Sequence, residues 1–237
     1  MFSVLLLIAA ALTYAQPFAS THFRATHNSY SGNVSGSKGS ITQQLDAGVR
    51  FIEFDIQDND YTTNGDYSLG HLVIGDEVDH SGGNPASNLL SDWLAVVNAW
   101  SAAHPTAAPI AVMVDLKDDI TDSNNINFAQ GNPSALNQKF LNAFGSRLFW
   151  GNGAQSLPDV STLHGKILPV MSGDGTTRSS YGRDGGNNPA IAHNNMGQVV
   201  EVHDSGGGDL WYWSGQVQSG KVAWLRHGKY GTGAFAF

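Results

Sequence analysis

Short apolar runs alternate with amphipathic segments over the first 172 residues of the chain. Nearly continuous apolar runs are typical of parallel strands that are covered on both faces, and apolar residues spaced by three or four indicate helices. The predicted strands are residues 23–25, 49–56, 69–71, 110–116 and 166–171. The predicted helices are residues 88–104 and 137–144, and residues 43–48 read as the end of a further short helix. Strands interleaved with helices predict an α/β fold of βαβ units.

Helix start and stop signals are clearest around residues 88–104. Ser91 can serve as an N-cap, and Pro105 follows as a terminator. Gly145 likewise follows the helix predicted at residues 137–144 and should end it.

The pattern changes after residue 172. Residues 174–188 are rich in Gly, Ser and Asn, and short strands without helix signals are predicted at 198–202, 210–213 and 222–226. Tyr181-Gly182 is echoed by Tyr230-Gly231, a spacing that fits a β repeat of roughly 40–50 residues. We therefore predict a short all-β repeat region at residues 181–237, truncated within its second copy; the alternative is a coincidence of glycine and aromatic residues.

The first residues read as a targeting segment. Residues 4–12 form an apolar run that is too short to span a bilayer, and Thr13-Tyr14-Ala15 is a plausible cleavage site. We expect a signal peptide at residues 1–15, a catalytic domain at 18–172 and an extracellular, secreted protein. The alternative for the apolar run is a buried N-terminal strand or helix. No transmembrane segment is predicted after it.

Composition excludes several classes of function. The chain has no cysteine, which rules out zinc–thiolate sites and cysteine nucleophiles. Its net charge of −8 argues against nucleic acid as a partner and against electrostatic docking on anionic lipid. We expect a monomer.

Chemically active side chains recur at or near the ends of the predicted strands. Glu53 and Asp55 are two residues apart on one strand, so both carboxylates point the same way. Two neighbouring acids repel unless a cation or base lies between them, which suits Ca²⁺ or Mg²⁺. The alternative is a salt-bridged pair with Arg50 or Lys117.

Asp115 and Lys117 face one way on the strand at 110–116, where polar residues are costly to bury without purpose. His27 and His71 follow other strands, and imidazole relays protons near neutral pH. Because parallel strands place their carboxyl ends at one rim, these groups should meet. The combination predicts metal-assisted cleavage of a phosphodiester.

Three segments resemble the catalytic X region of phosphatidylinositol-specific phospholipases C. They are Ala25-Thr26-His27-Asn28-Ser29-Tyr30, Gly48-Val49-Arg50-Phe51-Ile52-Glu53-Phe54-Asp55 and Gly70-His71, within a likeness over residues 20–172. The resemblance implies a TIM-barrel-like fold and, because Asn28 and Asp55 differ from the metal-independent bacterial members, the calcium-dependent branch. It implies that Asn28, Glu53 and Asp55 bind the ion.

The implied mechanism adds Asp115 as a fourth metal ligand. His27 would act as base or charge stabiliser, His71 would protonate the leaving alcohol, and Lys117 would neutralise phosphate charge. The expected activity is a phosphoric diester hydrolase that cleaves a phospholipid head group at a membrane surface, with a cyclic phosphate product.

One position departs from the eukaryotic members, which carry glutamate where Lys117 stands. Asp115-Leu116-Lys117 is similar to the Asp-x-Lys of sphingomyelinase D and glycerophosphodiester phosphodiesterases, whose aspartate binds Mg²⁺. An activity of that kind, with Mg²⁺, is therefore the alternative.

A full barrel needs eight strands, and fewer than eight are predicted before residue 172. The barrel is thus expected to be incomplete or closed by the repeat region. A rival from another class is a non-catalytic carbohydrate-binding protein that uses the aromatic residues of the β repeat.

Overall fold

The computed structural model describes residues 16, 18, 21–120, 133–149, 159–174, 176–177, 211–218 and 221–229. Its strands are β1 (His22–Thr26), β2 (Val49–Gln57), β3 (Ser68–Leu69), β4 (Ile110–Leu116), β5 (Ile167–Gly173), β6 (Trp211–Gln218) and β7 (Lys221–Lys229). Its α-helices are α1 (Ile41–Asp46), α2 (Tyr61–Asn64), α3 (Leu90–Ala103) and α4 (Pro133–Phe144). Short 3₁₀ helices are η2 (Ser29–Ser31), η3 (Gly145–Arg147) and η4 (Val160–Leu163).

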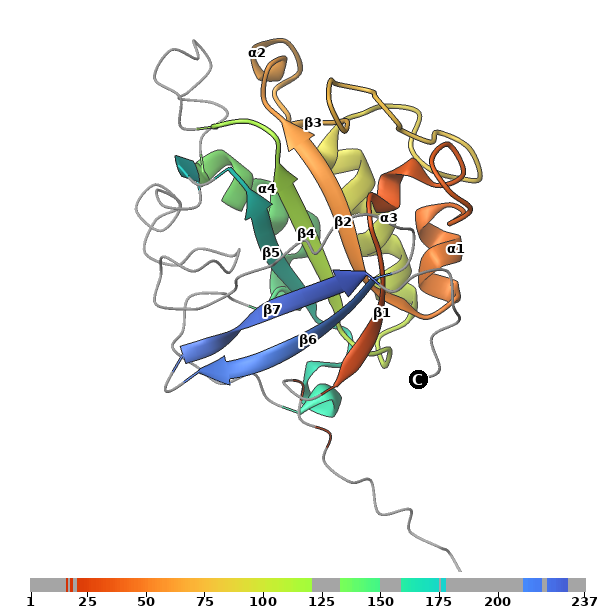
Figure 1. Ribbon diagram of the computed structural model, residues 1–237, viewed down its shortest axis with the longest axis vertical. Helices are drawn as coiled ribbons and strands as arrows, with labels where there is room; N and C mark the ends of the chain where they lie inside the picture. The colour runs from red at the N-terminus through yellow and green to blue at the C-terminus, as the bar shows by residue number, and fades with distance from the viewer. Residues whose placement is uncertain are drawn as a thin grey trace, which may run out of the picture.

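The strands form one mixed sheet in the order β5-β4-β2-β1-β6-β7 (Figure 1). Strands β5, β4, β2 and β1 are parallel, and β6 and β7 extend the sheet beyond β1 as antiparallel strands. Strand β3 pairs antiparallel with the end of β2. Among the described strands β5 and β7 are the two edges, so this part of the sheet is not closed. The parallel βαβ core confirms the predicted α/β class.

Successive residues of each strand face opposite sides of the sheet, and the two sides differ. On the outer face Ile52, Phe54 and Ile56 of β2 pack into one core with helices α1, α3 and α4. Trp93 of α3 is fully buried there and meets the Phe54 ring edge-on, with ring centroids 6.0 Å apart. The helices therefore cover this face and hold the parallel strands together.

The inner face carries a second apolar core at its amino end. Phe51 of β2 packs there with residues of β1, β4, β5 and η4, among them Met113 and Val170. Towards the carboxyl ends of β2 and β4 the same face becomes polar, from Glu53 onward. We call the apolar part of this face the apolar floor, and the polar part at the carboxyl ends of β2 and β4 the polar rim.

The predicted strands at 23–25, 49–56, 110–116 and 166–171 are confirmed as β1, β2, β4 and β5, with small shifts at their ends. The strand predicted at 69–71 ends at Leu69, so His71 lies in a loop. Pairing stops there because Gly70 onward folds back in a turn, in which the Gly75 N–H donates to the Leu69 carbonyl (2.8 Å).

The assignment of Ser91 as a helix N-cap is wrong. Helix α3 begins at Leu90, with Leu89 at its N-cap and no side-chain cap. The Ser91 N–H instead donates a hydrogen bond to Asp66 Oδ2 (3.0 Å). Because Asp66 lies 25 residues earlier in the chain, the local sequence cannot reveal this cap. The helix predicted at 137–144 begins four residues earlier, at Pro133, because proline suits the first turn.

Helix α4 ends at Phe144 as expected, and Gly145 begins the 3₁₀ helix η3. Strands β6 and β7 overlap the strands predicted at 210–213 and 222–226. The predicted signal peptide, the strand at 198–202 and most of the repeat region lie outside the described residues. No described helix combines the length and the apolar character that crossing a membrane requires.

Replacing Trp93 by alanine should lower the free energy of unfolding by about 3–5 kcal/mol, because it leaves a cavity between α3 and β2. The exposed Ala102→Ser variant on the same helix should change it by no more than about 0.5 kcal/mol. Urea unfolding of both variants checks this. A Trp93→Ala protein as stable as the wild type would show that this contact does not hold helix and sheet together.

Candidate active site

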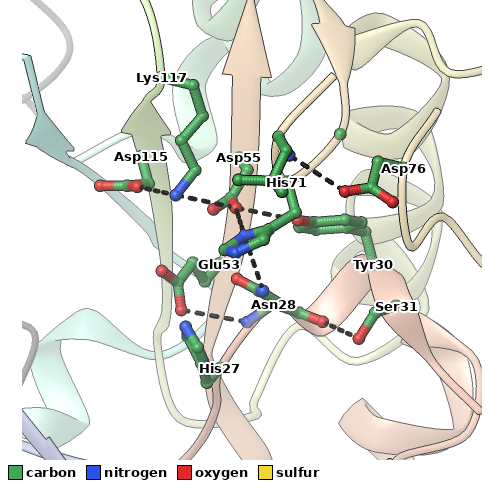
Figure 2. A network of polar contacts seen from close by, with 12 residues as sticks. His27, Asn28, Tyr30, Ser31, Glu53, Asp55, His71, Asp76, Asp115 and Lys117 are labelled. Atoms are coloured by element: carbon green, nitrogen blue, oxygen red, sulfur yellow. Dashed lines mark hydrogen bonds and ion pairs between the residues drawn. The ribbon is translucent and has the colours of Figure 1, made fainter. Parts of the chain in front are cut away.

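The polar rim of the inner face carries three carboxylates. Glu53 and Asp55 follow Phe51 at alternate positions of β2, and Asp115 lies directly beside Asp55 on the parallel strand β4. Each carboxylate offers an oxygen within 4.8 Å of the others. Glu53 is 2% exposed and Asp55 is 0% exposed. We call these three residues the carboxylate cluster (Figure 2).

The loop after β1 brings Asn28 to this cluster. Asn28 has a left-handed backbone (φ 44°, ψ 57°), which asparagine tolerates better than most residues, and it precedes helix η2. Its N–H donates to Glu53 Oε2 (3.2 Å), and its carbonyl accepts a hydrogen bond from the Ser31 hydroxyl (2.8 Å). Ser29 Oγ accepts from the Glu53 N–H (2.9 Å). Two hydrogen bonds therefore join the loop after β1 to strand β2 at Glu53.

Asp55 is the centre of the polar network. Its Oδ2 accepts a hydrogen bond from the Tyr30 hydroxyl (2.9 Å) and lies 2.9 Å from His71 Nδ1 and 3.1 Å from Lys117 Nζ. Burial raises the pKa of Asp55, and Asp115 adds to this, whereas Lys117 and His71 oppose it. Burial also raises the pKa of Tyr30, with Asp55 as the next cause, so its phenol stays protonated and donates.

Lys117 lies between two members of the cluster, with its Nζ 2.7 Å from Asp115 Oδ2 as well. Burial alone would lower the pKa of Lys117, but the carboxylates of Asp115 and Asp55 outweigh it and raise that pKa above its usual value. The lysine is therefore a fixed positive charge at neutral pH. The hydroxyl of Ser172, on β5, donates to the other oxygen of Asp115.

The two histidines reach the cluster from different loops. Figure 2 shows His27, from the loop after β1, near Glu53, and His71, from the loop after β3, beside Asp55. Lys38 Nζ donates to the His27 carbonyl (3.1 Å) and holds its loop. One third of the His71 side chain is exposed, so this imidazole can meet a substrate while bound to Asp55.

Two buried oxygens at the site have no hydrogen-bond partner among the described residues: Asn28 Oδ1 and Asp55 Oδ1. Leaving buried polar atoms unsatisfied is costly, and a cation would satisfy both. Carboxylate and amide oxygens are the ligands that Ca²⁺ and Mg²⁺ prefer. Asn28 and the carboxylate cluster therefore fit a hard divalent cation, although Lys117 already occupies Oδ2 of both aspartates.

The structure brings every sequence-predicted site residue to this rim: His27, Asn28, Glu53, Asp55, His71, Asp115 and Lys117. Of the alternatives for the acidic pair, Lys117 does contact Asp55, whereas Arg50 donates instead to the carbonyls of Leu45 and Val49.

Sequence reasoning gave no role to Tyr30, Ser29 or Ser172. Tyr30 and Ser29 lie inside the motif that carries His27, and Ser172 directly follows the predicted strand at 166–171. Their positions beside predicted site residues and strand ends could have marked them as candidates. Their hydrogen bonds could not be predicted, because these depend on contacts between segments far apart in the chain.

Solved structures with a similar fold include three of a calcium-dependent phosphoinositol-specific phospholipase C from Pseudomonas sp. The apo form described as a myoinositol complex is 22% identical, with a TM-score of 0.61 over 81% of this chain and 68% of that chain. Two further crystal forms are 21% and 20% identical, with TM-scores of 0.60 and 0.59 over 80% of this chain and 67% of those chains. These likenesses establish the predicted phospholipase C barrel-like fold.

No curated protein sequence matches the chain. The family described as phosphatidylinositol-specific phospholipase C, X domain, matches residues 14–170, which include both histidines and the carboxylate cluster. The chain therefore belongs to the phosphatidylinositol-specific phospholipase C X-domain family of phosphoric diester hydrolases.

Proposed function

We propose that the chain is a secreted, metal-dependent phospholipase C that cleaves phosphatidylinositol and releases a cyclic inositol phosphate. One observation carries the proposal: the carboxylate cluster, two of whose members are buried, and two unsatisfied buried oxygens lie beside two histidines. Such a site supplies the hard ligands and proton carriers that phosphodiester cleavage needs. The calcium dependence of the Pseudomonas phospholipase C supports Ca²⁺ over Mg²⁺.

Asn28, Glu53, Asp55 and Asp115 are the proposed ligands. A bound cation would stabilise charge on the phosphoryl oxygens and lower the pKa of the attacking hydroxyl. The inositol 2-hydroxyl attacks phosphorus and loses its proton, and the bond to the diacylglycerol oxygen breaks. His27, near Glu53, acts as the base or stabilises charge at the phosphate.

His71 protonates the departing diacylglycerol oxygen. Its Nδ1 lies 2.9 Å from Asp55 Oδ2, and that contact fixes the orientation of the ring. The proton for the leaving group is then carried by the opposite nitrogen, Nε2. Lys117 places a further positive charge beside the phosphate position.

A sphingomyelinase D-like or glycerophosphodiesterase-like activity is the second candidate. The close contact between Lys117 and Asp115 favours it, since both belong to the Asp-x-Lys pattern of those enzymes. The two candidates break different bonds or act on different head groups, so the products tell them apart.

The products formed from phosphatidylinositol, sphingomyelin and glycerophosphodiesters test the function directly. Phosphorus NMR should show a cyclic phosphodiester from phosphatidylinositol in Ca²⁺ and no product in excess EDTA, because the carboxylate cluster then lacks its cation. Turnover of sphingomyelin or glycerophosphodiesters with Mg²⁺, and none of phosphatidylinositol, would support the second candidate. Full activity in EDTA would contradict metal dependence.

Substituting the general acid should slow turnover specifically. His71→Ala is expected to lower kcat by about 10²–10⁴-fold, since the leaving alkoxide then departs without a proton. His80→Ala is the matched control, because His80 is exposed in the same long loop and its contacts, with the Pro85 carbonyl (2.7 Å) and the Trp93 ring, lie outside the proposed site. Steady-state rates of both variants check this. A wild-type rate in His71→Ala would contradict the assignment of His71 as the general acid.

The lysine should weaken cation binding while assisting the reaction. Lys117→Met removes a positive charge about 3 Å from two proposed ligands, so Ca²⁺ affinity should rise by roughly tenfold or more. Turnover should fall, because the charge beside the phosphate is lost. Calorimetric titration and rate measurements check the two effects separately. Unchanged or weaker Ca²⁺ binding would show that lysine and cation do not compete.

A further inference from the structure

The loop after β1, which carries two of the proposed site residues, is held by a buried side chain of helix α1. This side chain is Gln44, which is 1% exposed. Its Nε2 donates hydrogen bonds to the Ser29 carbonyl and to the Gly39 carbonyl (2.8 Å each). Its Oε1 accepts a hydrogen bond from the hydroxyl of Thr26, the last residue of β1 (2.6 Å). One amide therefore joins both ends of the loop to α1, which lies beside it (Figure 1).

Helix α1 directs Gln44 into the protein. Ile41 and Leu45 are fully buried in the core, and Gln44 shares their face because residues three and four apart lie side by side on a helix. Burying an amide is costly unless its polar atoms are hydrogen-bonded. Both the nitrogen and the oxygen of the Gln44 amide have partners, so this cost is met by contacts with the loop rather than with the apolar core.

These partners fix the direction of a chain of hydrogen bonds. The carbonyls of Ser29 and Gly39 can only accept, so the amide nitrogen of Gln44 faces them and its oxygen faces Thr26. The Thr26 hydroxyl gives its one proton to that oxygen. The Ser29 hydroxyl therefore directs its own proton at Thr26, whose Oγ1 and carbonyl oxygen lie 2.7 and 3.0 Å away. Because Ser29 Oγ also accepts from the Glu53 N–H (2.9 Å), the chain runs from β2 through the loop to α1.

The two anchored residues flank the two site residues. Thr26 and Ser29 are 2% and 0% exposed, and His27 and Asn28 lie between them in the chain. The left-handed backbone of Asn28 is a conformation that persists only where the surrounding structure holds it. The same residue carries the buried Oδ1 that has no hydrogen-bond partner among the described residues. The anchoring of residues 26 and 29 therefore decides where that oxygen and the neighbouring imidazole lie.

We propose that Gln44 is a positioning residue: it holds the turn at residues 26–29 against β2, so that Asn28 Oδ1 faces the cation and His27 stays near Glu53. The inference rests on the proposed function, since a metal ligand and a proton carrier are the groups that the turn has to place. Gln44 acts through the loop, because its three hydrogen bonds all go to loop or strand-end residues. Residues that orient metal ligands in this way typically contribute about 10–100-fold to metal affinity.

Calorimetric titration of the full chain with Ca²⁺ tests the positioning role. Gln44→Met keeps the length of the side chain and removes its hydrogen bonds, so Ca²⁺ should bind about 10–100-fold more weakly than to the wild type. Gln43→Met is the matched control: this neighbouring glutamine is exposed, and its Oε1 accepts from the Ser40 N–H (2.9 Å) at the helix N-cap. Its loss weakens the cap but not the turn, so the affinity should stay at the wild-type value. Wild-type affinity in Gln44→Met, or an equal loss in Gln43→Met, would overturn the inference.

A double-mutant cycle separates positioning from a general loss of stability. In an Asn28→Ala background, Gln44→Met should change Ca²⁺ affinity by less than about threefold, because the oxygen that Gln44 positions is already gone. Full additivity of the two substitutions would contradict the role. Thr26→Val is a second variant, which breaks the same chain of hydrogen bonds with a residue that suits a strand. It should weaken Ca²⁺ binding about tenfold, and a Thr26→Val chain that is folded by circular dichroism and binds like the wild type would also contradict it.

Amide hydrogen exchange in EDTA tests the turn without cation or substrate, and so separates this inference from the proposed function. The Asn28 N–H donates to Glu53 Oε2 (3.2 Å) and the Ser31 N–H to the Asn28 carbonyl (2.9 Å). Both amides should exchange at least about tenfold faster in Gln44→Met, while those of α3 keep their rates. Unchanged exchange in the turn, or equal acceleration in α3, would overturn the inference. A wild-type chain that binds neither Ca²⁺ nor Mg²⁺ would refute the proposed metal dependence, while exchange would still decide whether Gln44 holds the turn.

Discussion

Carboxylates that two parallel strands place side by side in the protein interior repel one another strongly, because little water screens them there. Asp55 and Asp115 are partners across β2 and β4, and Glu53 lies two residues before Asp55 on the same face. The apolar floor beneath them excludes water from one side. Folding is therefore compatible with these charges only if the surrounding elements supply donors or cations.

The rest of the site meets this requirement. Tyr30, His71 and Lys117 all converge on one oxygen of Asp55, and they come from the segments after β1, β3 and β4. The same carboxylate thus fixes the positions of the proposed proton carrier His71, a positive charge and a phenol. The opposite oxygen, together with Asn28 Oδ1, has no described hydrogen-bond partner. One oxygen of Asp55 is thus satisfied by three donors, and the other oxygen is left for the proposed cation.

Much of this was accessible from the sequence because the strands carry strong local patterns. The alternation in β2 placed Glu53 and Asp55 on one face, and the parallel arrangement placed Asp115 at the same rim. What could not be predicted depends on contacts between distant segments. The acceptor that caps α3 is the Asp66 carboxylate, and the left-handed turn at Asn28 is set by hydrogen bonds to β2 and η2. The position of Lys117 between two aspartates likewise depends on how its side chain folds back over the rim.

Because Asp55 links the proposed proton carrier to the proposed cation, binding of the cation itself is the most direct test of this account. Calorimetric titration of the wild-type chain with Ca²⁺ should show one site. Asp55→Asn, which keeps the shape of the side chain and removes its charge, should weaken that site by at least about 100-fold, in line with the loss of a charged ligand in a buried site. Circular dichroism would confirm that the variant remains folded. A wild-type chain that binds no Ca²⁺ or Mg²⁺, or a folded Asp55→Asn chain that binds equally well, would contradict the account.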